Sequence, residues 1–276
     1  MSRKLREELN AVLSKEEMAK LVSSYDLLGE MAIVEIPASL TDKETQIAGA
    51  IMRLNKRVKF VAKRVGRYCG EFRTVKHQTI LGEAQNEIEI VESGVRFLLN
   101  PQKVYFSPRM GNERRRIASL VQQGEDVLVM FSGIAPYPLI ISQYSKARSI
   151  TGVEKNLDAH EYAKKSLQLN KSLRNVVLHG GDVSEILPHL DSCFDRVVMV
   201  LPIKGEVYLP HALKLLKPGG HLHFYDMQFP ERFGDSIEKV TISASVQHRR
   251  VAQSTVTKCG HCGPQCYRVC VDATIL

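Results

Sequence analysis

The sequence contains no tryptophan and no apolar run that approaches the roughly 18 residues needed to cross a bilayer. Its amino terminus, Met1 to Glu8, is rich in charge and lacks the apolar core of a secretion signal. It also lacks any tract with the composition of a disordered segment. These absences predict a globular cytoplasmic protein with no membrane partner, while the missing tryptophan excludes nothing.

The composition that remains is that of an ordinary folded chain with an excess of positive charge. The chain has 276 residues, 44% hydrophobic and 25% charged, a length that suits one large domain or two small ones. The formal net charge is +8 and the sequence pI is near 9.2. Such a balance favours an anionic partner, although solubility alone also explains it. We expect a monomer.

The stretch from Asp126 to Glu154 organises the sequence. A short apolar run breaks at a turn containing Gly133, and a second β-branched run ends on Glu154. This pattern is typical of a βαβ nucleotide-binding unit, in which the carboxylate at the second strand end accepts the ribose hydroxyls. The turn is not G-x-G-x-x-G, so an adenosine ligand without phosphates, S-adenosylmethionine, fits better than NAD. The alternative is an ordinary α/β turn followed by a surface glutamate.

Hydrophobic periodicity and turn signals divide the rest of the chain into helices and strands. Helices are predicted over 2–13, 14–23, 41–55, 111–122, 156–170 and 208–216, with capping boxes at Ser14–Glu17 and Thr41–Glu44. Further strands are predicted over 25–37, 58–65, 71–79, 87–91, 95–99, 176–182, 194–201, 221–226, 238–246 and 266–271. The prediction is an α/β fold: a small α+β domain over residues 1–100, then a domain over 101–276 with a mostly parallel sheet and an antiparallel carboxyl-terminal edge.

Basic residues concentrate in the strands of the first domain. The segment from Arg53 to Lys76 contains only one acid, Glu71, against nine basic residues: Arg53, Lys56, Arg57, Lys59, Lys63, Arg64, Arg67, Arg73 and Lys76. A basic face of this kind holds a phosphate backbone without reading sequence. A solvated surface is the alternative.

Four of the six cysteines crowd the carboxyl end, at positions 259, 262, 266 and 270. Cys259 and Cys262 have the spacing of a two-ligand metal loop, with His261 and Cys266 as further candidates. Cys266 and Cys270 lie four apart on a predicted strand, too far apart to share a metal without a bend. Because zinc signatures usually pair two such loops, we favour buried thiols and predict no metal site.

Several motifs together resemble one enzyme family. They are Gly70-Glu71-Phe72-Arg73, Val104-Tyr105-Phe106-Ser107-Pro108-Arg109, Glu113-Arg114-Arg115-Arg116-Ile117-Ala118, Phe131-Ser132-Gly133-Ile134, Val153-Glu154-Lys155-Asn156, Gly181-Asp182, Leu201-Pro202 and Lys217-Pro218-Gly219-Gly220. The chain resembles the class I S-adenosylmethionine-dependent tRNA guanosine-37 N1-methyltransferases of archaea and eukaryotes. Related enzymes of that superfamily are the aminocarboxypropyltransferases of wyosine synthesis. The resemblance implies a Rossmann-like methyltransferase domain that acts on the tRNA anticodon stem-loop.

The resemblance also implies a role for individual residues. Glu113 is the expected general base for the guanine N1 proton, because that nitrogen is protonated at neutral pH. Arg73 is expected to stabilise negative charge on O6, and Pro202 belongs to the same catalytic group. The alternatives are a helix N-terminal acid for Glu113 and a phosphate contact for Arg73. The implied contacts to S-adenosylmethionine come from Phe106, Arg109, Phe131, Ser132, Gly133, Glu154, Lys155, Asp182 and Leu201.

Three positions depart from the family pattern. Val200 replaces an asparagine before Leu-Pro, Val129 replaces an aspartate before the glycine turn, and Ala135 replaces a second glycine. Losing one preorganised donor typically costs a factor of about one hundred or more in rate. Three functions therefore stay open: methyl transfer to guanosine 37, aminocarboxypropyl transfer to a tricyclic tRNA base, or tRNA binding with weak or lost catalysis.

Overall fold

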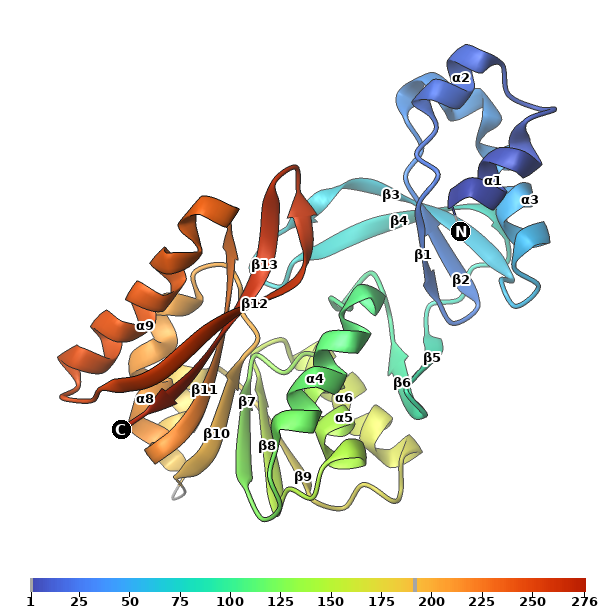
Figure 1. Cartoon of the computed structure of the whole chain (residues 1–276). Coiled ribbons are helices and arrows are strands. Elements are labelled where there is room, and N and C mark those ends of the chain that lie inside the picture. Colours follow the sequence, from blue (N-terminus) through green and yellow to red (C-terminus); the bar gives the residue numbers. More distant parts are fainter. Residues whose placement is uncertain (1, 191–192) are drawn as a thin grey trace. The chain divides into compact units, whose positions relative to one another are not determined.

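The protein is described here by a computed structural model covering residues 2–190 and 193–276, except for the side chains of Ser2 and Arg67. The chain forms two compact units, Met1–Pro108 and Arg109–Leu276 (Figure 1). The boundary thus falls after Pro108, whereas the sequence placed it after residue 100. No helix within the described ranges is long and apolar enough to cross a membrane.

Unit 1 is a four-stranded sheet packed against short helices. Its strands are β1 (Tyr25–Leu28), β2 (Met31–Val34), β3 (Phe60–Cys69) and β4 (Thr74–Gly82), hydrogen-bonded in that order. Helices α1 (Ser2–Leu9), α2 (Lys15–Lys20) and α3 (Glu44–Leu54) accompany the sheet, and β5 (Ile88–Glu92) and β6 (Val95–Leu99) form a separate hairpin. Buried Leu5, Leu9, Ile47 and Ile51 from α1 and α3 fill the core beside the sheet. Because β2 and β3 run parallel, α3 is the crossover that connects them.

Two local predictions in unit 1 were wrong. Residues 25–37 form an antiparallel pair of strands rather than one strand, because the chain turns at Gly29. Gly29 has φ +56°, and a Cβ there would lie 2.2 Å from the Glu89 carbonyl oxygen, so only glycine lets the β5–β6 hairpin pack so closely. The Thr41 capping box does not form, since the Thr41 hydroxyl donates to Ala38 in the 3-10 helix η1 (Ala38–Lys43). The Ser14 box is confirmed.

Unit 2 is built on a seven-stranded sheet in the order β12-β13-β11-β10-β7-β8-β9. Strands β7 (Asp126–Met130), β8 (Ser149–Glu154), β9 (Val176–Gly180), β10 (Phe194–Met199) and β11 (Leu216–Gln228) are parallel to one another. Strands β13 (Cys266–Ile275) and β12 (Val251–Gly263) pair antiparallel at one edge. The predicted mostly parallel sheet with an antiparallel carboxyl-terminal edge is confirmed.

Helices cover both faces of this sheet (Figure 1). On one face lie α4 (Gly111–Leu120), α5 (Pro136–Tyr144) and α6 (Leu157–Leu169). On the other lie the short α7 (Val183–Ile186), α8 (Leu209–Leu215) and α9 (Phe233–Val246), whose apolar side chains share one core with the sheet. Short 3-10 segments, η2 (Pro108–Met110), η3 (Leu187–His189), η4 (Gly205–Tyr208) and η5 (Pro230–Arg232), complete the connections. The carboxyl ends of the parallel strands are therefore the place for a ligand.

The predicted strand over 238–246 was wrong, since these residues belong to helix α9. Valine, threonine and isoleucine in this segment favour a strand by propensity. The buried positions nevertheless recur every fourth residue, at Ser236, Val240 and Ala244. That spacing places them on one helical face, and packing against the sheet overrides the local preference.

His77 on β4 makes unit 1 sensitive to mild acid. Its ring nitrogens lack a hydrogen-bond partner among the described residues, and burial, with Arg64 nearby, lowers the pKa of His77 to about 4. An unfolded histidine titrates near about 6.5. The unfolded chain therefore takes up the proton first, so unit 1 loses stability from about pH 6.5 down to about pH 4, below which this contribution stays constant.

We expect His77→Phe to remove most of that acid sensitivity. Amide hydrogen exchange of β3 and β4 at pH 7 and pH 5 measures it. His189→Phe, at an exposed position of unit 2, is the control and should leave the loss in β3 and β4 unchanged. An equal acid loss in His77→Phe would assign the effect to another group.

Candidate active site

The loop after β7 has an alternating backbone. Phe131, Gly133 and Ala135 have φ values of 62°, 59° and 63°, while Ser132 and Ile134 between them do not have positive φ. Alternation of this kind turns successive N–H groups toward one side and forms an anion-binding concavity. A Cβ on Gly133 would meet no atom within 4 Å, so space lies open beside the turn.

Glu154 lies against this turn and accepts one of its N–H groups, whereas the N–H groups of Ser132 and Ala135 donate to backbone carbonyls. Its carboxylate accepts hydrogen bonds from the N–H of Gly133 at 2.7 Å and of Asn156 at 2.8 Å. Burial raises the pKa of Glu154, and the backbone N–H groups of Asn156, Gly133 and Lys155 oppose that rise. The turn therefore orients a side-chain carboxylate instead of a ligand phosphate, which matches the absence of G-x-G-x-x-G. The oriented carboxylate can accept the two hydroxyls of a ribose.

Asp182 lies at the end of β9, the strand next to Glu154. It caps α7 by accepting hydrogen bonds from the N–H and hydroxyl of Ser184, and Lys155 lies 3.1 Å away. The hydrogen bonds from Ser184, with Lys155, lower the pKa of Asp182. Gly181 N–H donates to the Glu154 carbonyl, so the two acids project from adjoining strand ends. Phe131 packs edge-on against Tyr208, with ring centroids 5.0 Å apart.

The three departures from the family pattern fall in different environments. Val129 is fully buried in β7 between Gly152 and Val198, so it lies inside the sheet. Val200, Leu201 and Pro202 follow β10 and are half-buried, and the Val200 N–H donates to the Met130 carbonyl. A valine side chain has no hydrogen-bond donor. Ala135 is buried in the left-handed conformation that glycine adopts at lower cost.

Helix α4 carries three arginines that its dipole does not favour, and each has a specific packing partner. Arg114 is buried with its guanidinium over the Tyr137 ring, and Arg115 lies over Tyr144. Arg116 forms ion pairs instead. Stacking and pairing thus explain a charge pattern that opposes the helix dipole.

Glu113, in the first turn of α4, is buried and bound by several donors. Arg116 grips its carboxylate with two N–H groups, Nε to Oε2 at 2.8 Å and Nη2 to Oε1 at 2.7 Å. The Tyr225 hydroxyl donates to Oε1 at 2.5 Å. A bidentate arginine pair is a strong charge-assisted contact and fixes the plane of the carboxylate. Glu113 is therefore an oriented carboxylate rather than an exposed helix-terminal acid.

A polar chain continues from Arg116 across the sheet. Asp272 of β13 accepts from Arg116 Nη1 at 2.8 Å and lies 2.6 Å from His223 Nδ1. His223 Nε2 lies 2.7 Å from Arg196 Nη1, and Arg196 pairs with Glu125. Arginine can only donate, so Nε2 of His223 accepts and Nδ1 carries the proton that binds Asp272.

The pKa shifts of these hydrogen-bonded residues agree with that assignment. Burial lowers the pKa of His223 and keeps the ring neutral. Burial alone would raise the pKa of Asp272, but His223 and Arg116 hold it well below its usual range. The pKa of Arg116, lowered by burial, is raised overall by Glu113 and Asp272. These residues thus form a fully paired charged network that holds Glu113 in place.

Sequence reasoning missed Tyr225, His223 and Asp272 as parts of the site. Their signal is weak: polar side chains within strands that are otherwise apolar and buried. Polar groups in such strands are costly unless they are paired, which is the physical reason to examine them.

The predicted site residues Arg73 and Phe106 belong to unit 1, whereas Arg109 is exposed in unit 2. Arg73 sits in a turn with φ 50°, and its guanidinium lies over the Tyr105 ring, 5.5 Å from the centroid. Its buried Nη1 has no hydrogen-bond partner among the described residues. Such a nitrogen is available to an anionic ligand oxygen. Phe106 is buried against Phe97.

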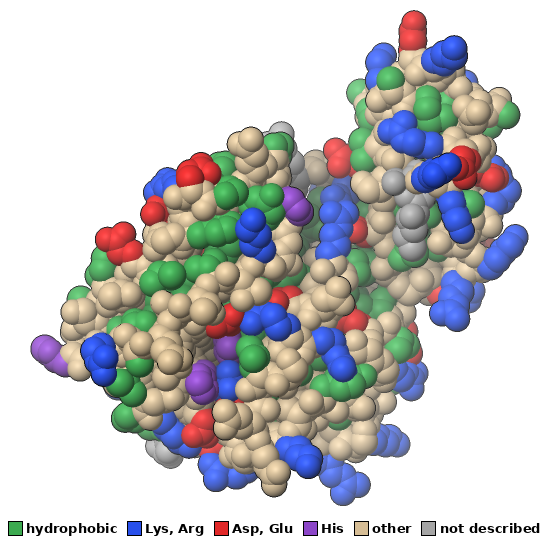
Figure 2. Space-filling view, viewed as in Figure 1, with side chains coloured by type: hydrophobic (Ala, Val, Ile, Leu, Met, Phe, Trp, Pro, Cys, Tyr) green, Lys and Arg blue, Asp and Glu red, His purple; other side chains and the backbone are tan. Residues whose placement is uncertain are grey.

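Four cations of the basic run are paired with acids from elsewhere in unit 1. The pairs are Arg53–Glu8, Lys59–Glu30, Lys63–Glu44 and Arg64–Asp26. Counting acids only within the run therefore overstated its excess of charge. The Arg67 side chain lies outside the described residues. Basic side chains are still numerous on the face of unit 1 that Figure 2 shows.

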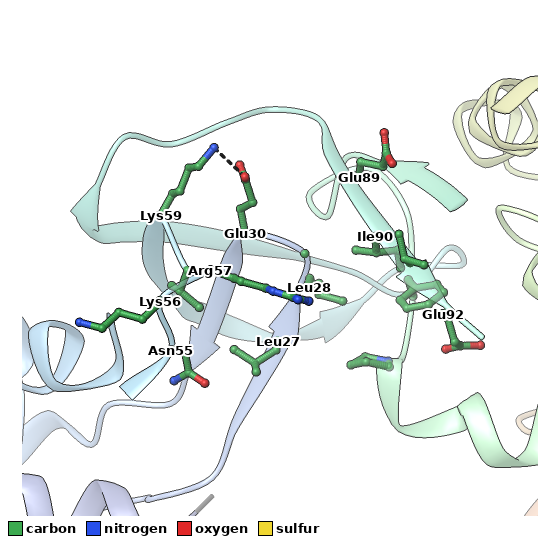
Figure 3. A pocket seen from close by; sticks show the side chains of 15 residues that line it. Leu27, Leu28, Glu30, Asn55, Lys56, Arg57, Lys59, Glu89, Ile90 and Glu92 are labelled. Carbon is green, nitrogen blue, oxygen red and sulfur yellow. Dashed lines mark ion pairs between the residues drawn. The ribbon is translucent and has the colours of Figure 1, made fainter. Parts of the chain in front are cut away.

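Unit 1 also contains a cavity of about 630 Å³. Its apolar wall includes Leu27, Ile90 and Phe106, and the segment Asn55–Lys59 supplies a rim with the cations Lys56, Arg57 and Lys59 (Figure 3). The acids Glu30, Glu89 and Glu92 also line the cavity. Lys59 is paired with Glu30 in that rim, whereas Lys56 and Arg57 are exposed. An apolar wall with exposed cations suits a nucleotide, whose base and phosphate need different surroundings.

The carboxyl-terminal cysteines lie on the β12–β13 hairpin. Cys259 and Cys262 fall within β12 rather than in a loop, and Cys266 and Cys270 fall within β13. Among described residues, one group of His, Cys, Asp or Glu brings three possible metal ligands together: His223, Cys270 and Asp272. Arg116 and Arg196 contact two of its members, and nearby cations disfavour a bound metal ion. That group is part of the polar network.

Comparison with known proteins places the chain among transferases. The profile described as "TRM5/TYW2 methyltransferase domain" matches residues 88–252, and "TYW2 N-terminal domain" matches residues 5–85. The chain belongs to the TRM5/TYW2 methyltransferase family. The resemblance inferred from the motifs is therefore confirmed. The family match covers both units and includes the Glu154 turn and Glu113.

Named relatives include both branches of the family. The tRNA (guanine(37)-N(1))-methyltransferase Trm5b of Pyrococcus abyssi is 32% identical over 260 residues, 91% of this chain and 74% of that protein. A tRNA(Phe) (4-demethylwyosine(37)-C(7)) aminocarboxypropyltransferase of Methanocaldococcus jannaschii is 28% identical, covering 90% and 96%. The structure of aTrm5 in complex with tRNALeu matches with TM-score 0.84 and 27% identity, covering 100% and 79%.

Proposed function

We propose that the protein transfers the methyl group of S-adenosylmethionine to N1 of guanosine 37 in tRNA. The observation that carries this proposal is the buried Glu113 carboxylate, held and oriented on α4 by hydrogen bonds from Arg116 and Tyr225. A guanine N1–H needs a proton acceptor during methyl transfer, and an oriented carboxylate supplies one. The Pyrococcus abyssi relative is named for the same reaction.

The residues of the Glu154 turn fit S-adenosylmethionine. We propose that Glu154 accepts the ribose hydroxyls, that Asp182 lies near the adenine, and that Phe131, Ser132, Gly133, Lys155 and Leu201 complete the contacts, with Phe106 and Arg109. The bound cofactor supplies an activated methyl group. Open space beside Gly133 and the buried, backbone-held carboxylate of Glu154 support this fit. The protein then contributes mainly positioning.

In the proposed reaction the N1–H bond of guanine breaks and its proton moves to Glu113. S-adenosylmethionine, held by the residues of the Glu154 turn, would supply the methyl group that replaces this proton on N1, with its sulfur keeping the electron pair of the broken bond. Negative charge that develops on O6 is stabilised by Arg73, whose buried Nη1 is available for it. Pro202 shapes the target site beside Val200. The same proposal places the enzyme in the cytoplasm as a monomer.

A methylation assay tests the function directly. Unmodified tRNA with guanosine at position 37 should gain a methyl group at N1, and the same tRNA with adenosine there should not. Aminocarboxypropyl transfer is the second candidate, favoured by the Methanocaldococcus jannaschii relative. It requires a tricyclic base, and the mass of the modified nucleoside separates the two. No product on guanosine-37 tRNA, beside an active control enzyme, would contradict the proposal.

The cavity rim of unit 1 predicts a salt-dependent contribution to tRNA binding. A double variant, Lys56→Ala with Arg57→Ala, should weaken tRNA binding and flatten its salt dependence, by about 0.7 to 0.9 in slope per lost phosphate contact. Filter binding from low to high salt measures this. Lys15→Ala with Lys20→Ala, at exposed positions on α2, removes the same charge and should change the slope less. Equal salt slopes for both double variants would mean that Lys56 and Arg57 contribute only through the overall positive charge of the protein.

A further inference from the structure

The two oxygens of the Glu113 carboxylate have unequal surroundings. Oε1 accepts two strong donors, Arg116 Nη2 at 2.7 Å and the Tyr225 hydroxyl at 2.5 Å. Oε2 accepts Arg116 Nε at 2.8 Å. The Cys259 thiol, a weak donor, is also hydrogen-bonded to the Glu113 carboxylate. Each carboxylate oxygen offers about two lone-pair sites, so Oε1 is filled. A further proton has its place on Oε2.

Tyr225, the donor to Oε1, is held rigidly in the core of unit 2. It is 1% exposed on β11, and its hydroxyl also accepts from Tyr137 on α5 at 3.0 Å. Because Tyr137 donates to Tyr225, the Tyr225 proton is directed to Glu113. Burial raises the pKa of Tyr225 well above its ordinary value, so the hydroxyl stays protonated and acts as a donor.

We infer that Tyr225 is a positioning residue that fills Oε1 of Glu113 and directs the guanine N1 proton to Oε2. This inference rests on the proposed role of Glu113 as the base. Tyr225 takes part in the reaction only through Glu113, because its hydroxyl is hydrogen-bonded to Glu113 and Tyr137. A hydrogen bond donated to a carboxylate favours its ionised form, so removal of the donor is expected to change the pH dependence of turnover.

The groups around Glu113 come from five elements of unit 2. They are Arg116 on its own helix, Tyr137 on α5, Tyr225 on β11, Cys259 on β12, and Cys270 and Asp272 on β13. Burial raises the pKa of the Cys259 and Cys270 thiols, so both stay uncharged near neutral pH. Arg116 stays cationic and Asp272 ionised, since their pKa values are shifted away from neutrality. None of these four side chains therefore changes charge near neutral pH.

Tyr225→Phe removes the hydroxyl and keeps the ring. The acid limb of the turnover profile should move to higher pH by roughly one to two units, the equivalent of one hydrogen bond to a charged group. The KM for tRNA should stay unchanged, and turnover should recover at high pH. Tyr137→Phe is the matched control, because its hydroxyl meets Tyr225 and not Glu113, and its acid limb should move much less.

A second readout does not depend on activity. Carbon-13 NMR titration of the Glu113 carboxyl, assigned by its loss in Glu113→Gln, should show the same upward shift in Tyr225→Phe. If the titration midpoint of the Glu113 carboxyl shifts in Tyr225→Phe but no methylated guanosine forms in any variant, the proposed function fails while the positioning role stands. An unshifted carboxyl, an equal shift in Tyr137→Phe, or activity lost equally at all pH values in a folded Tyr225→Phe would overturn the inference.

Discussion

Glu113→Gln is expected to lower turnover by roughly one hundred to ten thousand fold while tRNA affinity stays near that of the unchanged protein. The amide matches the carboxylate in shape but cannot take up the guanine proton. It also loses the charge that pairs with Arg116, so the base is both neutral and less firmly oriented. Single-turnover methylation with saturating tRNA measures the rate of the chemical step.

Glu161→Gln is the matched control. This exposed residue of α6 pairs with Lys164 and makes the same chemical change far from the polar network. Its rate should stay within about twofold, since exposed ion pairs contribute little. A Glu113→Gln variant that keeps most of its rate would leave Glu113 with a structural role only.

Asp272→Ala is expected to destabilise unit 2 by about 3 to 5 kcal/mol, the range for removing one partner of a buried charged pair. The substitution leaves Arg116 without its second carboxylate and the His223 Nδ1–H without an acceptor. Protonation of Asp272 should act in the same direction. Its folded-state pKa is depressed, so its contribution is present above about pH 4 and is lost as the pH falls further.

Hydrogen exchange of the β11 and β13 amides measures this loss strand by strand. Asp235→Ala serves as comparison, because Asp235 forms an exposed pair with Arg232 in the same unit and should cost less than about 1 kcal/mol. Similar protection in both variants would mean that the polar network contributes little to the stability of the sheet.

Much of the architecture follows from local patterns in the sequence. The stretch from Asp126 to Glu154 predicts its own βαβ geometry because strand, turn and carboxylate lie within one short segment. The Ser93–Gly94 hairpin and the Ser14 cap are equally local. Where two local signals compete, the prediction fails. The β-branched residues of α9 favour a strand, whereas its buried positions recur every fourth residue, as in a helix, and packing of that face against the sheet decides the structure.

The candidate site was predictable only in part. Motif resemblance located Glu113, but nothing near it in sequence indicates what holds it. Arg116 and Asp272 are 156 residues apart, and Tyr225 is 112 residues from Glu113. The basic run shows the same limit, since its neutralising acids Glu8 and Asp26 lie outside it. Contacts between residues far apart in the sequence depend on how the strands and helices are arranged, and a single sequence does not reveal which distant residues meet.

From the difference in sequence separation between these contacts we expect an order of events during folding. The cradle for the cofactor needs contacts across only 21 residues, between Gly133 and Glu154, whereas the clamp on the base needs α4 and β13 to meet. Contacts that close long loops form slowly. We expect a chain in which β13 has not yet joined the sheet to lack the Asp272 contact that holds Arg116 beside Glu113. Such an immature molecule could bind its donor and still modify nothing.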